Sequence, residues 1–316
     1  MLRYGNQIVL IFLGVLLTVH AYARPAGQCP PQNGVALQVL GSGGPIADDG
    51  RASTGYIVWV NGESKILIDA GGGTFLRFGE AAASFEDLDF IGLSHFHTDH
   101  SADLSALLKS GYFTGRERSL SIAGPDGSDI FPGLKSYLQR MLNEKGEGAY
   151  GYLSGYLNGT GGLPTLIPFE IGRGTKGPAM ITDDNPSDIQ ISAMHVSHGI
   201  VPALAFRVRI GATVIVFSGD QNGSDPRFIE FAKNATLLVM HMPIPEGTVG
   251  AARRLHAPPS IIADIARQSG VKTLMLSHFM ARSLVDIKES LKLIQSIYSG
   301  NVLTTKDLDC IVADSQ

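Results

Sequence analysis

Short apolar runs and longer amphipathic stretches alternate along the chain, and this order predicts its elements. The first half opens with apolar runs at 35–40, 55–60 and 64–69, and Asn61-Gly62 between the last two is a hairpin signal. The same pattern predicts further strands at 90–93 and 120–123, and helices at 74–83, 102–109 and 131–142.

The second half begins with strands and then alternates strands with helices. The expected strands are 189–196, 203–210, 213–217, 236–240 and 273–276, and the expected helices are 226–234, 259–268 and 284–298. Two halves of this kind predict an α/β fold in which two sheets pack face to face with helices outside.

Composition limits the classes of protein to consider. The chain has 316 residues, of which 44% are hydrophobic, enough for one large core. Its formal net charge is -4 and it contains no block of basic residues, so no nucleic-acid surface is expected.

The first 23 residues differ from the rest. Arg3 precedes an apolar run at 8–19, and Ala21-Tyr22-Ala23 matches a signal-peptidase site. We therefore expect a signal peptide at 1–23 and a single domain at 24–316, periplasmic or secreted, with no stable membrane anchor. A retained anchor is the alternative, but the apolar run is short for a span.

Two further features of the exported chain are left open. Cys29 and Cys310 either form a disulfide or are unrelated, and neither has metal-ligand spacing. The segment 146–162 holds seven glycines and three tyrosines, and is either a lid over a substrate or an ordinary surface loop.

The densest chemistry lies at residues 94–100, Ser-His-Phe-His-Thr-Asp-His, between an expected strand and helix. His95 and His97 point the same way and can hold one ion, while Asp99 and His100 face a second position. Burying so many ionisable groups without a cation would cost roughly several kcal/mol of folding free energy. The segment therefore predicts a metal site.

Three residues at other strand ends can complete this site: His198, Asp220 and His278. His195 competes with His198, and His241 follows another strand. We interpret both competitors as supporting or packing residues.

Several motifs together resemble the metallo-β-lactamase superfamily of hydrolases, over nearly all of the chain after residue 23. They are Leu40-Gly41-Ser42-Gly43, Ile68-Asp69-Ala70-Gly71, the 95–100 segment, Ser218-Gly219-Asp220 and Leu276-Ser277-His278-Phe279. The resemblance implies a four-layer αβ/βα sandwich of two mixed β-sheets flanked by helices.

The resemblance also implies a ligand set for two divalent metal ions, with Zn²⁺ favoured and Mn²⁺ or Fe as alternatives. It places His95, His97 and His198 on one ion, and Asp99, His100 and His278 on the other. Asp220 bridges the two ions.

The segment His256-Ala257-Pro258-Pro259-Ser260 resembles the branch that contains ribonuclease Z, cyclic-nucleotide phosphodiesterases and bacterial arylsulfatases. In that branch the residue matching His256 assists the leaving group, and Asp99 handles the proton of the nucleophile. Ribonuclease Z carries a tRNA-clasping arm between the third and fourth metal motifs, whereas only 21 residues separate His198 from Asp220. The short gap and the signal peptide argue against ribonuclease Z.

We therefore expect an exported binuclear hydrolase of phosphodiester or aryl sulfate esters, using a hydroxide shared by the two ions. Its partner would be a small-molecule ester, and a homodimer is possible. A lactonase or thioesterase is the alternative. A tRNA 3′-processing endonuclease and a non-catalytic binding protein are less favoured.

Overall fold

The apolar runs of the first half build one mixed sheet. The computed structural model describes residues 29, 33–143, 145, 148–174, 177–181 and 188–313, so the predicted signal peptide and residues 146–147 of the glycine-rich segment lie outside the described residues. The seven strands, in spatial order, are β14 (Cys310–Val312), β1 (Val35–Gly41), β2 (Gly55–Val60), β3 (Glu63–Ala70), β4 (Phe90–Gly92), β5 (Leu120–Pro125) and β6 (Leu166–Ile171).

The second half builds another seven-stranded sheet. Its spatial order is β13 (Asn301–Thr304), β12 (Thr273–Ser277), β11 (Leu237–His241), β10 (Thr213–Phe217), β9 (Val201–Ile210), β8 (Ile189–His198) and β7 (Ala179–Met180). The inner faces of the two sheets share a core that includes Tyr56, Phe90, Phe206 and Phe217.

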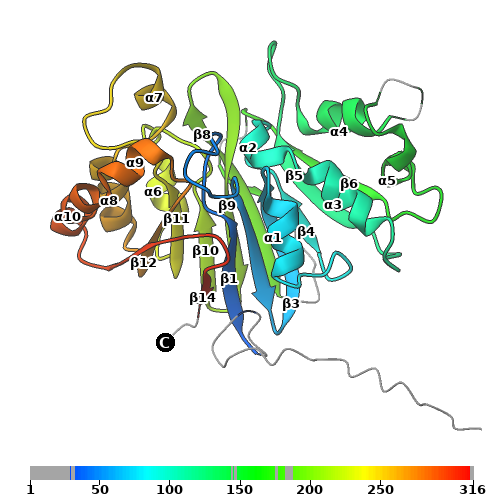
Figure 1. The fold of residues 1–316 in the computed structure, drawn as a ribbon, viewed down its shortest axis with the longest axis horizontal. Helices are drawn as coiled ribbons and strands as arrows, with labels where there is room; N and C mark the ends of the chain where they lie inside the picture. Colours follow the sequence, from blue (N-terminus) through cyan, green and yellow to red (C-terminus); the bar gives the residue numbers. More distant parts are fainter. Residues whose placement is uncertain are drawn as a thin grey trace, which may run out of the picture.

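Helices cover the outer faces, as Figure 1 shows. On the first sheet lie α1 (Thr74–Glu80), α2 (Thr98–Ser101), α3 (Leu104–Gly111), α4 (Leu134–Leu142), the 3-10 turn Gly151–Leu153 and α5 (Gly155–Asn158). On the second half lie α6 (Arg227–Phe231), α7 (Gly250–Leu255), α8 (Pro259–Ser269), α9 (Ala281–Val285) and α10 (Ile287–Ile297). The expected four-layer αβ/βα sandwich is confirmed.

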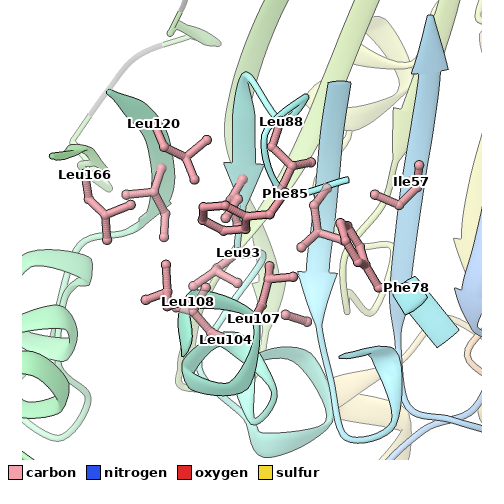
Figure 2. Close-up of a cluster of buried hydrophobic side chains, with 14 of the residues drawn as sticks. Ile57, Phe78, Phe85, Leu88, Leu93, Leu104, Leu107, Leu108, Leu120 and Leu166 are labelled. Carbon is pink, nitrogen blue, oxygen red and sulfur yellow. The ribbon is translucent and has the colours of Figure 1, made fainter. Parts of the chain in front are cut away.

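The spacing of apolar residues along the helices explains how the helices pack on the sheets. In α3, Leu104, Leu107 and Leu108 are buried and pack with Phe85 and Leu120 of the first sheet's outer core (Figure 2). Positions three and four apart lie on one face of a helix, so the three leucines form a single apolar stripe.

Some expected boundaries were wrong. The helix expected at 284–298 is two helices, because the chain departs from helical geometry at Asp286, where ψ is 20°. Strands β6, β7, β13 and β14 were not expected. The short terminal strand β14 pairs antiparallel with β1 and is joined to Cys29 by the Cys29–Cys310 disulfide. None of the described helices is long and apolar enough to cross a membrane.

Parallel pairing brings several strand ends to one edge of the sandwich. β3, β4 and β5 run parallel in one sheet, and β10, β11 and β12 run parallel in the other. Their carboxyl ends therefore meet at the same edge of each sheet, where loops collect polar side chains.

Candidate metal centre

The structure gathers all seven expected ligands at this edge. His95, His97, Asp99 and His100 follow β4, and His198 ends β8. Asp220 follows β10 and His278 follows β12. Apart from the partly exposed His97, the seven side chains are buried.

The first cluster contains His95, His97 and His198, whose ligand atoms lie within 4.8 Å of one another. His95 Nε2 is 2.9 Å from His97 Nδ1. The Nδ1 atom of His198 donates to the carbonyl oxygen of Leu255 at 2.9 Å, which leaves a lone pair on its buried Nε2. Outer hydrogen bonds of this kind select the tautomer of a metal-binding histidine.

The second cluster contains His100, His278 and Asp99. His100 Nδ1 donates to Asp69 Oδ2 at 2.8 Å, so its Nε2 points inward. That Nε2 lies 3.1 Å from His278 Nε2 and 3.5 Å from Asp99 Oδ2. His278 adopts a positive φ of 55°, which is strained for a residue other than glycine and typical of functional positions.

Asp220 lies between the two clusters. Its Oδ2 atom is 3.7 Å from His198 Nε2 of the first cluster and 3.7 Å from His100 Nε2 of the second. A carboxylate in this place can contact a cation in either cluster, as the bridging role requires.

The charge states suit cation binding. Burial by itself would raise the pKa of the Asp220 carboxyl. The nearby imidazoles of His278, His256 and His100 lower it by more, so the pKa falls well below its usual value. The same balance, dominated by His100 and His278, lowers the pKa of Asp99. Burial lowers the pKa of His95 and keeps its imidazole neutral. Burial opposes the charged form of His100 and His278, but the surrounding carboxylates raise the pKa of both imidazoles above its usual value. Metals bind neutral imidazoles and ionised carboxylates, so a bound cation would take the place of the proton on these two rings.

The donor set therefore fits divalent cations. Ring nitrogens of different histidines face one another at 2.9 Å between His95 and His97 and at 3.1 Å between His100 and His278, and a cation in each cluster would bind both nitrogens of such a pair. Imidazole-rich sites with a few carboxylates favour zinc.

The two competitor histidines lie in different places. His195 is outside the clusters, with Nε2 2.8 Å from the carbonyl oxygen of Ile171 and 3.4 Å from Asp126. His241 lies close to His100, Asp220 and His278, and its Nδ1 is 2.7 Å from Asp220 Oδ1. The interpretation of His241 as a supporting residue is compatible with these contacts.

His256 faces the same centre, with Nδ1 3.7 Å from Asp220 Oδ2, and this nitrogen has no hydrogen-bond partner among the described residues. Burial lowers the pKa of His256 to about 3, so its ring is neutral at pH 7. We expected a protonated His256 to act on the leaving group. An anionic substrate beside His256 would raise its pKa and favour the protonated ring.

A cavity of 680 Å³ opens onto the centre. Its wall includes apolar Phe96, Leu255 and Met280, with the cation Arg282 beside them. The described tyrosines of the 146–162 segment do not line it, and Tyr156 is buried in the core. The structure therefore does not support an aromatic lid from this segment.

Two contributors escaped the sequence analysis. Asp69 accepts from the backbone N–H of Ser94 at 2.7 Å as well as from His100. Tyr56 places its hydroxyl 3.2 Å from His241 Nε2. The Ile68-Asp69-Ala70-Gly71 motif signalled Asp69, whereas no local pattern marks Tyr56.

Comparison with known proteins identifies the class. The family model described as "Beta-lactamase superfamily domain" matches residues 64–279, so the chain belongs to this superfamily and is a metal-dependent hydrolase by family. Ribonuclease Z from Methanosarcina mazei is 25% identical over 294 residues, covering 85% of this chain and 95% of the relative. Ribonuclease Z from Mycobacterium bovis is 27% identical over 256 residues, covering 77% and 85%.

Two solved structures share the fold. The metallo-beta-lactamase fold protein YhfI from Bacillus subtilis has a TM-score of 0.66 and 23% identity, covering 88% of this chain and 100% of that chain. The short form of human tRNase Z has a TM-score of 0.67 and 19% identity, covering 89% and 100%.

These relatives contradict two expectations. We ranked ribonuclease Z below an exported hydrolase of small phosphodiester or aryl sulfate esters, and we expected a small-molecule partner without a nucleic-acid surface. The matched relatives are ribonucleases Z. The short gap before Asp220 shows only that no arm is inserted between His198 and Asp220. The net charge of the whole chain does not indicate whether one part of its surface contacts RNA. Neither observation bears on the reaction itself.

Proposed function

We propose that this protein is a binuclear, zinc-dependent hydrolase of phosphodiester bonds in RNA, of the ribonuclease Z type. The observation that carries the proposal is the position of Asp220 Oδ2, 3.7 Å from one imidazole nitrogen in each cluster. The ribonuclease Z relatives, which cover most of the chain, supply the substrate class.

The ligand roles follow from the geometry. His95, His97 and His198 would hold one cation, Asp99, His100 and His278 the other, and Asp220 would contact both. When bound, such cations lower the pKa of a water molecule and neutralise charge on phosphoryl oxygens.

The remaining residues handle protons and position the substrate. Asp99 lies at the cavity wall, where its carboxylate can orient the attacking water and accept its proton. His256 lies on the same wall and can give a proton to the departing oxygen. Arg282 is anchored by donation to the Pro243 carbonyl at 2.8 Å and adds a positive charge for a phosphate.

Contacts to the rest of an RNA must come from outside the segment that joins His198 to Asp220. That segment contains only β9 and β10 with short turns on either side. The bulk of the RNA would therefore lie over other parts of the cavity rim.

The test is hydrolysis by purified zinc-loaded protein of a tRNA precursor with a 3′ extension and of a bis-aryl phosphate. We expect cleavage of both, and a loss of about 10²-fold or more in Asp220→Asn, which keeps the size of the side chain but removes its charge. Turnover of an aryl sulfate or lactone with no cleavage of either phosphodiester would contradict the proposal.

A further inference from the structure

A tyrosine and a histidine, both buried, lie in line behind the carboxylate of Asp220. Tyr56 is in β2 of the first sheet and is fully buried. His241 ends β11 of the second sheet. The Tyr56 hydroxyl is 3.2 Å from His241 Nε2, and His241 Nδ1 is 2.7 Å from Asp220 Oδ1.

The chemistry of the three groups fixes the direction of both hydrogen bonds. An ionised carboxylate only accepts, so His241 Nδ1 carries the hydrogen that points to Asp220. In the neutral ring, Nε2 is then an acceptor, and the Tyr56 hydroxyl donates to it. The two bonds hold the imidazole in one tautomer and one orientation.

The contacts of His241 differ from those of His198, although His241 lies close to His100, Asp220 and His278. Both of its ring nitrogens are engaged by Tyr56 and Asp220, whereas His198 keeps its Nε2 without a hydrogen-bond partner among the described residues. His241 can therefore orient a ligand without being one.

The carboxylate of Asp220 is the group that this arrangement positions. Its Oδ1 faces His241 and also lies 3.4 Å from His278 Nε2. Its Oδ2 faces His100, His198 and His256, each at 3.7 Å. Rotation of the carboxylate would remove Oδ2 from the place between the two clusters.

We propose that Tyr56 and His241 are positioning residues, which fix the carboxylate of Asp220 and thereby strengthen binding of the second cation. The inference rests on the metal centre of the proposed function and not on its RNA substrate. Because Tyr56 lies in one sheet and His241 in the other, the packing of the sandwich would set the geometry of the metal site.

The test is metal retention by Tyr56→Phe, which removes one hydroxyl and keeps the aromatic ring. We expect affinity for one of the two cations to fall by about 10- to 100-fold, as for other outer partners of metal ligands. Zinc retained at a series of buffered chelator concentrations measures the affinity, and the absorption spectrum of cobalt-loaded protein shows whether one site has changed geometry.

Tyr156→Phe is the matched control. Tyr156 is also fully buried, and its hydroxyl donates to the Leu108 carbonyl at 2.8 Å, away from the centre. It should keep both cations with wild-type affinity and an unchanged cobalt spectrum. Wild-type affinity and spectrum in Tyr56→Phe would overturn the inference.

A second pair of variants decides the question if Tyr56→Phe does not fold. The amide N–H of His241→Asn can take the place of Nδ1–H and donate to Asp220, whereas His241→Leu cannot. We expect Asn to retain the second cation better than Leu. Equal loss in both would overturn the inference and make His241 a ligand. None of these readouts uses RNA, so failure of the RNA assay is distinguishable from failure of this inference.

Discussion

In His198 and His100 of the centre, a hydrogen bond on the outer side of the ring determines which nitrogen faces inward. Leu255 does this for His198 and Asp69 for His100. His256 differs, because its Nδ1 has no hydrogen-bond partner among the described residues and points toward Asp220. Such a ring is free to act on a bound substrate.

His256→Ala should keep both metal ions and lower turnover by about 10²-fold or more, because general acid catalysis contributes that much. Metal analysis and the rate of bis-aryl phosphate hydrolysis, measured on the same preparation, check the prediction. Loss of one cation in this variant would instead identify His256 as a ligand.

His195 supplies a pH prediction away from the centre. Burial lowers its pKa, so as the pH falls below about 6.5 the unfolded chain binds the proton first. The free energy of unfolding therefore decreases as the pH falls from about 6.5 toward the lower pKa that His195 has in the folded protein. We expect the free energy of unfolding to fall less between pH 7.5 and 5.5 in His195→Gln than in wild type. Parallel pH profiles from denaturant titrations would contradict this.

Local spacing revealed residues 95–100, which carry four expected ligands within six positions. The distant expected ligands His198, Asp220 and His278 were found from their places at strand ends and from the family motifs. Tyr56 reaches His241 across 185 positions and between two sheets. A tyrosine in an apolar strand has no local mark of such a role.

At the scale of elements, the backbone of the turn after β3 lies in close contact with the start of α2. A Cβ atom on Gly71 would lie 2.1 Å from the carbonyl oxygen of Asp99, whereas on the adjacent Gly72 it would meet nothing closer than 3.9 Å. Gly73 has a positive φ of 91°, which favours glycine, whereas close approach of the backbone is the requirement at Gly71.

Gly71→Ala should therefore displace Asp99 and lower the free energy of unfolding by about 1–3 kcal/mol through overpacking. It should also weaken binding of the second cation, the one that Asp99 would hold. Gly72→Ala is the neighbouring control and should keep both properties. Thermal unfolding and zinc retention of the two variants test this. Equal behaviour of the pair would contradict the contact with Asp99.

Among the elements, the long periodic segments were predicted and the short edge strands were not. The α8 stripe of Ile262, Ala263, Ile265 and Ala266 is readable from its spacing. The strand β14 has only three residues, and its pairing with β1 depends on contact between distant ends of the chain.

For the whole molecule, the Cys29–Cys310 disulfide ties the start of the described chain to β14. Such bonds form in oxidising compartments. A periplasmic or secreted location stays a prediction, as does the division into a signal peptide and one domain, because residues 1–23 lie outside the described part.

Replacing both cysteines by serine should lower the free energy of unfolding by about 2–5 kcal/mol. The ligands come from other strand ends, so both metal ions should remain bound. Denaturant unfolding and metal analysis of the variant check the two parts. Loss of a cation on removing the disulfide would show that the terminal strand supports the centre.

The central claim is that one chain holds two cations bridged by Asp220. Metal analysis of protein purified without added metal, combined with its hydrolysis rate, tests this most directly. We predict about two zinc equivalents per chain in wild type and fewer in Asp220→Asn, with activity falling as metal is removed. Full activity with less than one equivalent per chain would contradict the binuclear account.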